Sequence, residues 1–218
     1  MLPKAILWDL DGTLLNTLED LAASTNAALA MHGMPTRSLS EVRAFVGNGV
    51  RKLIERAVPE GTGEEAAEHV LADFIAHYGA HSRDNTAPYP GVMDMLRALH
   101  ARGVRMAVVS NKVDFATKEL SALYFGELMG AAVGDDPSRE KKPAPDSPRL
   151  AMRLLSVAPE DCVYIGDSDV DVQTAANAGT ACIAVSWGFR DRACLIAAGA
   201  PRIADTPEEL LAMLTEEE

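Results

Sequence analysis

The stretch that decides the fold is residues 4–13, Lys-Ala-Ile-Leu-Trp-Asp-Leu-Asp-Gly-Thr. Its apolar part, residues 4–8, is short and ends at turn-forming residues, a pattern typical of a buried β-strand. Further apolar runs of this kind follow along the chain, and helical patterns separate them. Because strands and helices alternate, the sequence predicts an α/β core: a Rossmann-like, doubly wound parallel sheet with helices on both faces. The other predicted strands are residues 105–110, 128–133, 162–166, 181–185 and, more weakly, 202–204.

One long segment interrupts this alternation after the first strand. Residues 16–85 contain no convincing strand pattern but several helical ones. Thr17-Leu-Glu-Asp20 has the form of a capping box, which predicts a helix that begins there and runs to Gly33. We therefore expect a catalytic core of residues 1–15 and 86–218, with residues 16–85 inserted as a helical cap. The other predicted cap helices begin after Ser38 or Ser40 and cover residues 49–58 and 64–78.

The composition excludes several classes of function. The chain has 32 Asp and Glu against 20 Lys and Arg, which gives a net charge of −12. A surface this acidic repels phosphate backbones, so we expect no nucleic-acid partner. Its three cysteines show no disulfide-like spacing, which favours a reducing compartment. The apolar run at the N-terminus is too short for a signal peptide, and the longest uncharged stretch, residues 172–189, is broken by polar residues. We therefore expect a cytoplasmic protein without a membrane span.

Polar clusters follow four of the predicted strands. Each cluster taken alone has an ordinary structural explanation, such as an Asx turn, a helix cap or an exposed loop. Ligands of open parallel sheets bind beyond the carboxyl ends of the strands, however, so the architecture brings all four clusters to one site. The clusters are Asp9, Asp11, Gly12 and Thr13; Ser110, Asn111 and Lys112; Asp135, Asp136, Lys141, Lys142 and Pro143; and Gly166, Asp167, Ser168, Asp169 and Asp171.

The residue types in these clusters indicate phosphate chemistry. Carboxylates at adjacent strand ends, such as Asp9 and Asp167, repel each other unless a cation lies between them. Ligation by oxygen alone selects a hard ion, Mg²⁺ before Ca²⁺ where phosphate is handled. Hydroxyl, amide and ammonium donors from Ser110, Asn111 and Lys142 can hold phosphate oxygens. One carboxylate of the first cluster could attack phosphorus while its neighbour handles a proton.

The four clusters resemble the motifs of the haloacid dehalogenase-like hydrolase superfamily, and the resemblance covers essentially the whole chain. Dehalogenase members lack a second Asp where Asp11 stands, which favours phosphatase chemistry. Within the superfamily the chain looks most like the phosphoglycolate phosphatase group. The segments that carry this closer resemblance are Val46-Gly47-Asn48-Gly49, Tyr89-Pro90-Gly91, Ser110-Asn111-Lys112 and Lys141-Lys142-Pro143-Ala144-Pro145.

The resemblance implies roles for the carboxylates. Asp9 would be the nucleophile that forms an aspartyl-phosphate, and Asp11 would be the general acid toward the leaving group and then the base toward water. Mg²⁺ would be held by the Asp9 carboxylate, the Asp11 backbone carbonyl and Asp167. Asp171 would support the metal indirectly or through water.

The resemblance also assigns the donors. Ser110 and Lys142 would bind the phosphoryl group, with Asn111 helping. Thr13 would help to place Asp11 or the phosphoryl group. Lys142 would therefore be both a catalytic and a phosphate-binding residue.

The cap is expected to select the substrate. Gly47-Asn48-Gly49 follows no strand and is no dinucleotide fingerprint, but its glycines could let the backbone approach a ligand. Arg51 adds a positive charge near it, and could equally be an ordinary helix-surface residue. Gly47, Asn48, Gly49 and Arg51 are therefore candidate specificity residues.

These observations predict a Mg²⁺-dependent phosphomonoester hydrolase, with 2-phosphoglycolate as the substrate that the resemblance favours. Alternatives on the same site are a nucleotide, sugar-phosphate or pyrophosphate phosphatase and a β-phosphoglucomutase. A different class, a phospho-accepting receiver module without turnover, would be roughly 120 residues long and have no cap. The expected partner is a small phosphorylated metabolite, and the chain could be a monomer or a homodimer.

Overall fold

The computed structural model describes residues 2–215. These residues form two compact units. One unit contains the chain up to Leu15 and from Pro88 onward, and the other contains Asn16–Ala87. The chain passes between the units in two short strands, β2 (Leu15–Asn16) and β3 (Ala87–Pro88).

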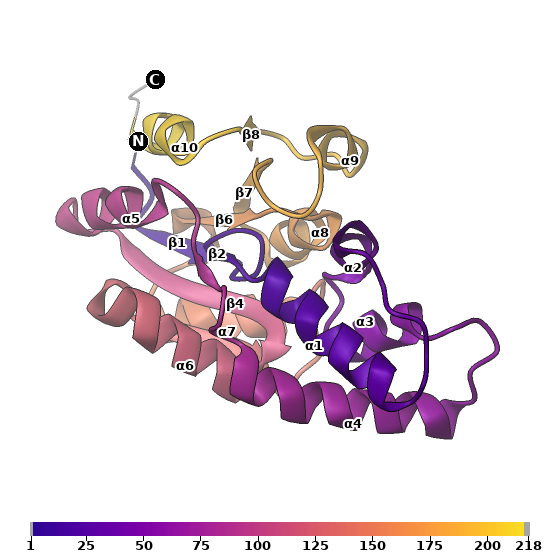
Figure 1. Cartoon of the computed structure of the whole chain (residues 1–218). Coiled ribbons are helices and arrows are strands. Elements are labelled where there is room, and N and C mark those ends of the chain that lie inside the picture. Colours follow the sequence, from indigo (N-terminus) through magenta and orange to yellow (C-terminus); the bar gives the residue numbers. More distant parts are fainter. Residues whose placement is uncertain (1, 216–218) are drawn as a thin grey trace. The chain divides into compact units, whose positions relative to one another are not determined.

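A parallel sheet organises the first unit and confirms the predicted α/β class (Figure 1). Within residues 2–215 this sheet has six strands in the order β5-β4-β1-β6-β7-β8, and every described pair is parallel. The strand that begins the chain therefore lies in the interior of the sheet, between strands that come much later in the sequence. The strands are β1 (Ala5–Trp8), β4 (Arg105–Val113), β5 (Ala131–Asp135), β6 (Cys162–Gly166), β7 (Ala181–Val185) and β8 (Ile203–Ala204).

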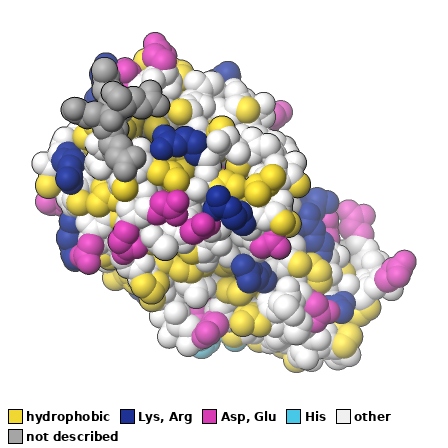
Figure 2. All heavy atoms as spheres, turned by 90° about the horizontal axis from the view of Figure 1, so that it is seen from above, with side chains coloured by type: hydrophobic (Ala, Val, Ile, Leu, Met, Phe, Trp, Pro, Cys, Tyr) yellow, Lys and Arg dark blue, Asp and Glu magenta, His cyan; other side chains and the backbone are white. Residues whose placement is uncertain are grey.

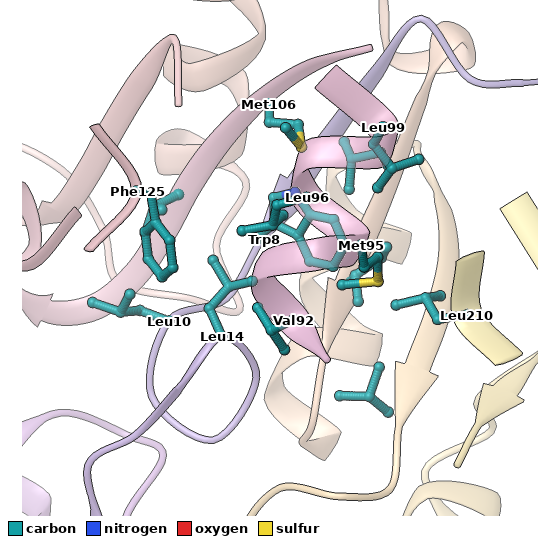
Figure 3. Packing of buried hydrophobic residues seen from close by; sticks show 14 of the residues in the cluster. Trp8, Leu10, Leu14, Val92, Met95, Leu96, Leu99, Met106, Phe125 and Leu210 are labelled. Atoms are coloured by element: carbon teal, nitrogen blue, oxygen red, sulfur yellow. The ribbon is translucent and has the colours of Figure 1, made fainter. Parts of the chain in front are cut away.

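Helices cover both faces of this sheet, so β1 is buried on both sides. Ile6 and Trp8 belong to one hydrophobic cluster and Ala5 and Leu7 to the other, as the alternation of a strand requires. Figure 3 shows Trp8 packed beside Leu96 and Met95 of α5. Fully burying a large apolar side chain stabilises a fold by ~1.5–3 kcal/mol, so this strand anchors the core. The helices are α5 (Val92–Ala101), α6 (Asp114–Phe125), α7 (Asp146–Leu155), α8 (Asp169–Ala178), α9 (Arg192–Ala197) and α10 (Pro207–Thr215), with short 3₁₀ turns η1 (Gly126–Leu128) and η2 (Pro159–Asp161).

Two predicted strands differ from the structure by more than one residue at an end. The run predicted at residues 128–133 starts later, because Gly126–Leu128 forms a 3₁₀ turn before β5. Strand β4 is longer than predicted, since its pairing with β5 shifts register between Val109 and Val113 and then resumes. Residues 110–112 therefore lie inside β4 at this irregularity rather than in a loop after it.

The second unit is helical, with α1 (Leu18–Met31), α2 (Leu39–Phe45), α3 (Val50–Ala57) and α4 (Glu64–His81). Ser38 begins α2 with a complete capping box, in which Ser38 and Glu41 satisfy each other's backbone amides. Figure 1 shows α1 and α4 lying along each other. Phe74 and Tyr78 of α4 are buried and stack on each other, with ring centroids 5.5 Å apart.

The capping box predicted at Thr17 and Asp20 is wrong. The Thr17 side chain makes no capping hydrogen bond, although Thr17 does precede the helix. Asp20 is buried and instead accepts hydrogen bonds from the backbone and side chains of Asn85 and Thr86, at 2.7–3.1 Å. These partners lie far along the chain, so a local pattern could not reveal them. Four donors bond to the Asp20 carboxylate in this way, which stabilises it more than a single bond from the local Thr17 amide would.

The surface carries charges of both signs. Figure 2 shows basic and acidic side chains interspersed on the face drawn there, with apolar side chains between them. No helix within residues 2–215 is both long enough and apolar enough to cross a membrane.

Candidate active site

The candidate site lies where β1, β4 and β6 approach their carboxyl ends. Trp8 pairs with Val108 on one side and with Ile165 on the other. This register brings Asp9, the residue that follows β1, level with the end of β6, and the Asp9 amide donates to the Ile165 carbonyl at 2.8 Å. The sheet therefore places the first, second and fourth polar clusters side by side, as strand topology alone predicts.

Three buried carboxylates meet at this point. Asp9, Asp167 and Asp171 are 8%, 2% and 1% exposed, and each offers an oxygen within 4.8 Å of the others. The pKa of Asp167 is raised to about 7, mainly by burial and secondly by the negative charge of the neighbouring Asp171. Burial and the same neighbour also raise the pKa of Asp9 well above its usual range. Without a cation, the site therefore resists full ionisation.

The Lys142 ammonium lies among these carboxylates. Its Nζ is 3.0 Å from Asp9 Oδ1 and 2.8 Å from Asp171 Oδ1, and it donates to the Tyr164 hydroxyl at 3.1 Å. Burial alone would lower the pKa of Lys142, but the carboxylates of Asp171 and Asp9 raise it well above its usual value. Lys142 is therefore charged.

The charge count of the site fits a divalent cation. Three carboxylates and one ammonium leave two negative charges in a buried place if all are ionised. Isolated buried charges are costly unless they are paired or bind a metal. An all-oxygen donor set suits a hard ion, so the residues present fit a metal of this kind.

Asn111 holds the backbone of Lys142. The Asn111 Oδ1 accepts from the Lys142 amide at 2.8 Å, and its Nδ2 donates to the Lys142 carbonyl at 3.1 Å. This reciprocal pair joins β4 to the loop after β5. Ser110 lies beside Asn111 and is buried, and its hydroxyl oxygen accepts from the Lys112 amide at 3.2 Å. The second and third polar clusters are thus brought together.

The loop after β1 contains Asp11, Gly12 and Thr13. Both Asp11 oxygens accept from the Lys112 ammonium, at 3.0 and 3.2 Å. Thr13 donates to Asp167 Oδ1 at 3.3 Å, so its hydroxyl supports the Asp167 carboxylate. Gly12 has φ +86°, and a Cβ there would overlap the Asp167 carboxylate. Glycine is required at this position both by conformation and by space.

Asp171 serves the helix as well as the site. Ser168 caps α8 in a complete capping box with Asp171, whose Oδ2 accepts from the Ser168 hydroxyl at 2.5 Å. The other Asp171 oxygen faces Lys142. The helix terminus therefore fixes this carboxylate at the edge of the site.

Some residues of the predicted clusters point elsewhere. Asp169 has a half-exposed side chain whose Oδ1 lies 3.8 Å from Arg190 Nε. Asp135 pairs with Lys141 at 2.7 Å, and Asp136 accepts from Ser138. None of these three acids belongs to the carboxylate group found within residues 2–215.

The loop after β7 takes part in the site, although sequence reasoning missed it. The Phe189 amide donates to Asp167 Oδ2 at 2.6 Å, and Trp187 Nε1 donates to the Thr13 carbonyl at 3.0 Å. A Cβ at Gly188 would overlap both the Gly12 carbonyl oxygen and the Asp167 side chain. The available signal was its position after the parallel strand next to β6. Tyr164 was also missed, because it reads as an ordinary buried residue of β6.

The candidate specificity residues lie in the helical unit. Gly47 and Gly49 both have positive φ, and Gly49 immediately precedes α3. Asn48 accepts from Arg56 at 2.8 Å, and Arg51 forms a two-pronged ion pair with Glu68. Within its own unit, Arg51 is therefore already engaged by a carboxylate.

Known proteins resemble this chain in sequence and in fold. Phosphoglycolate phosphatase 1 of Pseudomonas aeruginosa is 37% identical over 194 residues, which is 86% of this chain and 71% of that protein. The crystal structure of a proposed phosphoglycolate phosphatase from Lactobacillus delbrueckii has a TM-score of 0.95 and 33% identity, with 100% of both chains covered. CbbY of Rhodobacter sphaeroides, solved in complex with phosphate, has a TM-score of 0.75 and 30% identity over 95% of this chain and 96% of that one.

A family model also matches this chain. The model described as haloacid dehalogenase-like hydrolase matches residues 6–185, which include all four polar clusters. The match begins in β1 and ends with β7, so it spans the carboxylate group and Lys142. The chain therefore belongs to the haloacid dehalogenase-like hydrolases and is an enzyme of that family.

Proposed function

We propose that this enzyme is a Mg²⁺-dependent phosphomonoester hydrolase that acts through an aspartyl-phosphate on Asp9. The observation that carries the proposal is the buried group of Asp9, Asp167 and Asp171 with the Lys142 ammonium among them. Such a group can hold a divalent cation and leave one carboxylate oxygen to react with a phosphoryl group. The Asp9 carboxylate, the Asp11 backbone carbonyl and Asp167 would hold Mg²⁺, with support from Asp171. When bound, Mg²⁺ would offset the negative charge of the phosphoryl oxygens.

In this proposal Asp9 is the nucleophile and Asp11 transfers the protons. An Asp9 carboxylate oxygen attacks phosphorus, and the bond to the leaving oxygen breaks while Asp11 donates a proton to that oxygen. Asp11, now a carboxylate, then takes a proton from water as the water oxygen attacks phosphorus and releases inorganic phosphate from Asp9. Asp11 thus ends protonated as it began, and one phosphomonoester and one water give one alcohol and one phosphate.

The remaining site residues bind and orient the phosphoryl group. The Ser110 hydroxyl and the Lys142 ammonium would donate to its oxygens. Asn111 would act mainly through Lys142, since its amide holds the Lys142 peptide from both sides. Thr13 would act through Asp167, to which it donates.

The substrate class is a small phosphorylated metabolite, and 2-phosphoglycolate is the substrate that we propose. The relatives named phosphoglycolate phosphatase support this choice, and the related structure that holds phosphate supports a phosphoryl site. Gly47, Asn48, Gly49 and Arg51 would discriminate between leaving groups. Arg51 would have to break its ion pair with Glu68 in order to bind the substrate. Arg51→Ala should therefore change kcat/KM ratios between substrates.

The test is turnover of a panel of phosphomonoesters by the purified protein, with Mg²⁺ and with excess chelator. We expect phosphoglycolate to have the highest kcat/KM and the chelator to abolish turnover. The panel includes a nucleotide, a sugar phosphate and pyrophosphate, so a different best substrate would correct the substrate and keep the reaction. Asp9→Asn should abolish turnover. Residual activity within about tenfold of the wild type would exclude Asp9 as the nucleophile, because tenfold is only ~1.4 kcal/mol of barrier. Stoichiometric phosphorylation without turnover would instead indicate a receiver-like module.

A further inference from the structure

Lys112 has no part in the chemistry described above, yet its ammonium is placed against a reacting group. The Lys112 side chain is 4% exposed and that of Asp11 is 16% exposed. Its Nζ donates to both oxygens of Asp11, at 3.0 and 3.2 Å. A lysine ammonium buried to this degree is unusual unless polar partners satisfy it, and the Asp11 carboxyl group accepts two hydrogen bonds from it.

The backbone of Lys112 is held on both sides. Its amide donates to the Ser110 hydroxyl at 3.2 Å, and its carbonyl accepts from the Thr117 hydroxyl at 3.1 Å. Gly134 packs closely against the same carbonyl, since a Cβ at that glycine would lie 2.7 Å from the oxygen. The backbone that carries the Lys112 side chain is therefore fixed in β4, next to Ser110 and Asn111.

The backbone of Asp11 is also held, but its side chain lies in a tight loop. The Gly12 amide donates to the Leu15 carbonyl at 2.9 Å, and Asp11 forms an isolated β-bridge with Leu15. An aspartate in such a loop can occupy several side-chain rotamers. The two hydrogen bonds from the buried Lys112 ammonium favour one of these Asp11 rotamers.

We propose that Lys112 is a positioning residue, which holds the Asp11 carboxyl group where it transfers protons. The inference rests on the role given to Asp11 in the proposed function. Correct placement of a reacting group contributes strongly to rate, and a displacement of about 1 Å can cost ~10²-fold. Loss of Lys112 should therefore impair the two proton transfers that use Asp11 and leave phosphoryl binding largely intact.

Two aryl phosphates separate these effects. Phenyl phosphate and p-nitrophenyl phosphate carry the same phosphoryl group, but phenolate is the stronger base and depends more on proton donation as it leaves. The value of kcat/KM reports on the steps up to departure of this group. A general loss of charge or of phosphate binding lowers kcat/KM equally for both substrates. A misplaced Asp11 lowers it mainly for phenyl phosphate.

The experiment measures kcat and KM for both substrates in the full-length Mg²⁺-loaded enzyme. We expect Lys112→Met to lower kcat/KM for phenyl phosphate by ~10–100-fold and for p-nitrophenyl phosphate by less than about threefold, with the loss in kcat rather than KM. Lys112→Arg should recover part of the loss. Lys112→Met should add little to Asp11→Asn in the double variant. Lys118→Met is the matched control, because Lys118 is an exposed lysine on the neighbouring helix α6.

The outcomes distinguish this inference from the function on which it rests. If Asp11→Asn affects both substrates equally, then Asp11 is not the proton donor and that part of the proposed function fails. If Asp11→Asn is selective for phenyl phosphate but Lys112→Met lowers both equally, then only the role of Lys112 is overturned. If circular dichroism shows that Lys112→Met does not fold, Lys112→Gln decides, since it keeps a donor without the charge. An equal loss for both substrates in Lys112→Gln also overturns the inference.

Discussion

Replacing Asp167 with Asn should stabilise the metal-free protein while it removes Mg²⁺-dependent activity. Asn has the shape of Asp and can keep both contacts of this side chain. Its carbonyl oxygen can accept from the Phe189 amide, and its amide group can donate to the Thr13 hydroxyl. The substitution therefore removes one charge from the buried carboxylate group without opening a cavity.

The magnitude follows from the pKa of Asp167, which is raised from 3.8 to about 7 in the folded protein. Below pH 3.8 the carboxyl is protonated in both the folded and the unfolded chain and contributes nothing. As pH rises from there to about 7, the unfolded chain has lost the proton that the folded protein keeps, so the folded state loses up to about 4 kcal/mol. Asn removes this cost but buries an amide, so we expect a net gain of ~1–3 kcal/mol above pH 7.

The assay is thermal unfolding in excess chelator at about pH 8 and about pH 5.5. For a chain of this size 1 kcal/mol shifts Tm by ~2–4 °C, so the variant should melt several degrees above the wild type at the higher pH. At the lower pH the gain should shrink by about 2 kcal/mol, because part of the cost is then absent from the wild type. Added Mg²⁺ should stabilise the wild type more than the variant.

The control for this prediction is Asp169→Asn, which removes a half-exposed carboxylate two residues away. Its stability should stay within ~0.5 kcal/mol of the wild type at both pH values. The reasoning is refuted if Asp167→Asn is no more stable than the wild type at about pH 8 in chelator, or if its gain is the same at both pH values.

Three further substitutions test the supports of the fold and the site. Gly188→Ala should destabilise the protein by ~1–3 kcal/mol, because the new Cβ would overlap the Asp167 side chain; an unchanged Tm would contradict this packing. Asn111→Ala should lower kcat/KM by ~10-fold or more while it changes Mg²⁺ affinity little, as steady-state kinetics and metal titration would show; a loss confined to metal affinity would refute the role given to Asn111. Asp20→Ala should cost ~2–4 kcal/mol in chemical denaturation, because the buried amide and hydroxyl of Thr86 lose their acceptor together with the amide of Asn85, and Asp20→Asn should cost less.

The core of the fold could be predicted because its strands carry a strong local signal. Residues 4–8 form an apolar run closed by turn residues, and β1 occupies Ala5–Trp8 with both faces buried. The parallel topology then brings the polar residues at the strand ends together without further information. For this reason the association of Asp9 with Asp167 and Lys142 could be predicted from their positions after strands of a parallel sheet.

The details that could not be predicted depend on contacts between distant segments. The Thr17-Leu-Glu-Asp20 pattern satisfies the capping-box rule, but Asp20 is taken by Asn85 and Thr86. The irregularity of β4 depends on its pairing with β5. The contribution of the loop after β7 consists of one backbone amide and one glycine, which carry no chemical signature in a sequence.

The burial of β1 on both faces determines how long Asp9 keeps its position. Amide protons of a central strand exchange with solvent only when the whole domain opens, whereas loops and termini exchange through small local openings. The Asp9 amide is bonded to the Ile165 carbonyl at the end of such a strand. In a hydrogen-exchange experiment the amides of β1 should therefore be among the slowest in the molecule, with the Asp9 amide close behind them. The backbone of the residue proposed as the nucleophile should therefore keep its position until the whole domain opens. The loops that carry the other site residues should open earlier, through local fluctuations.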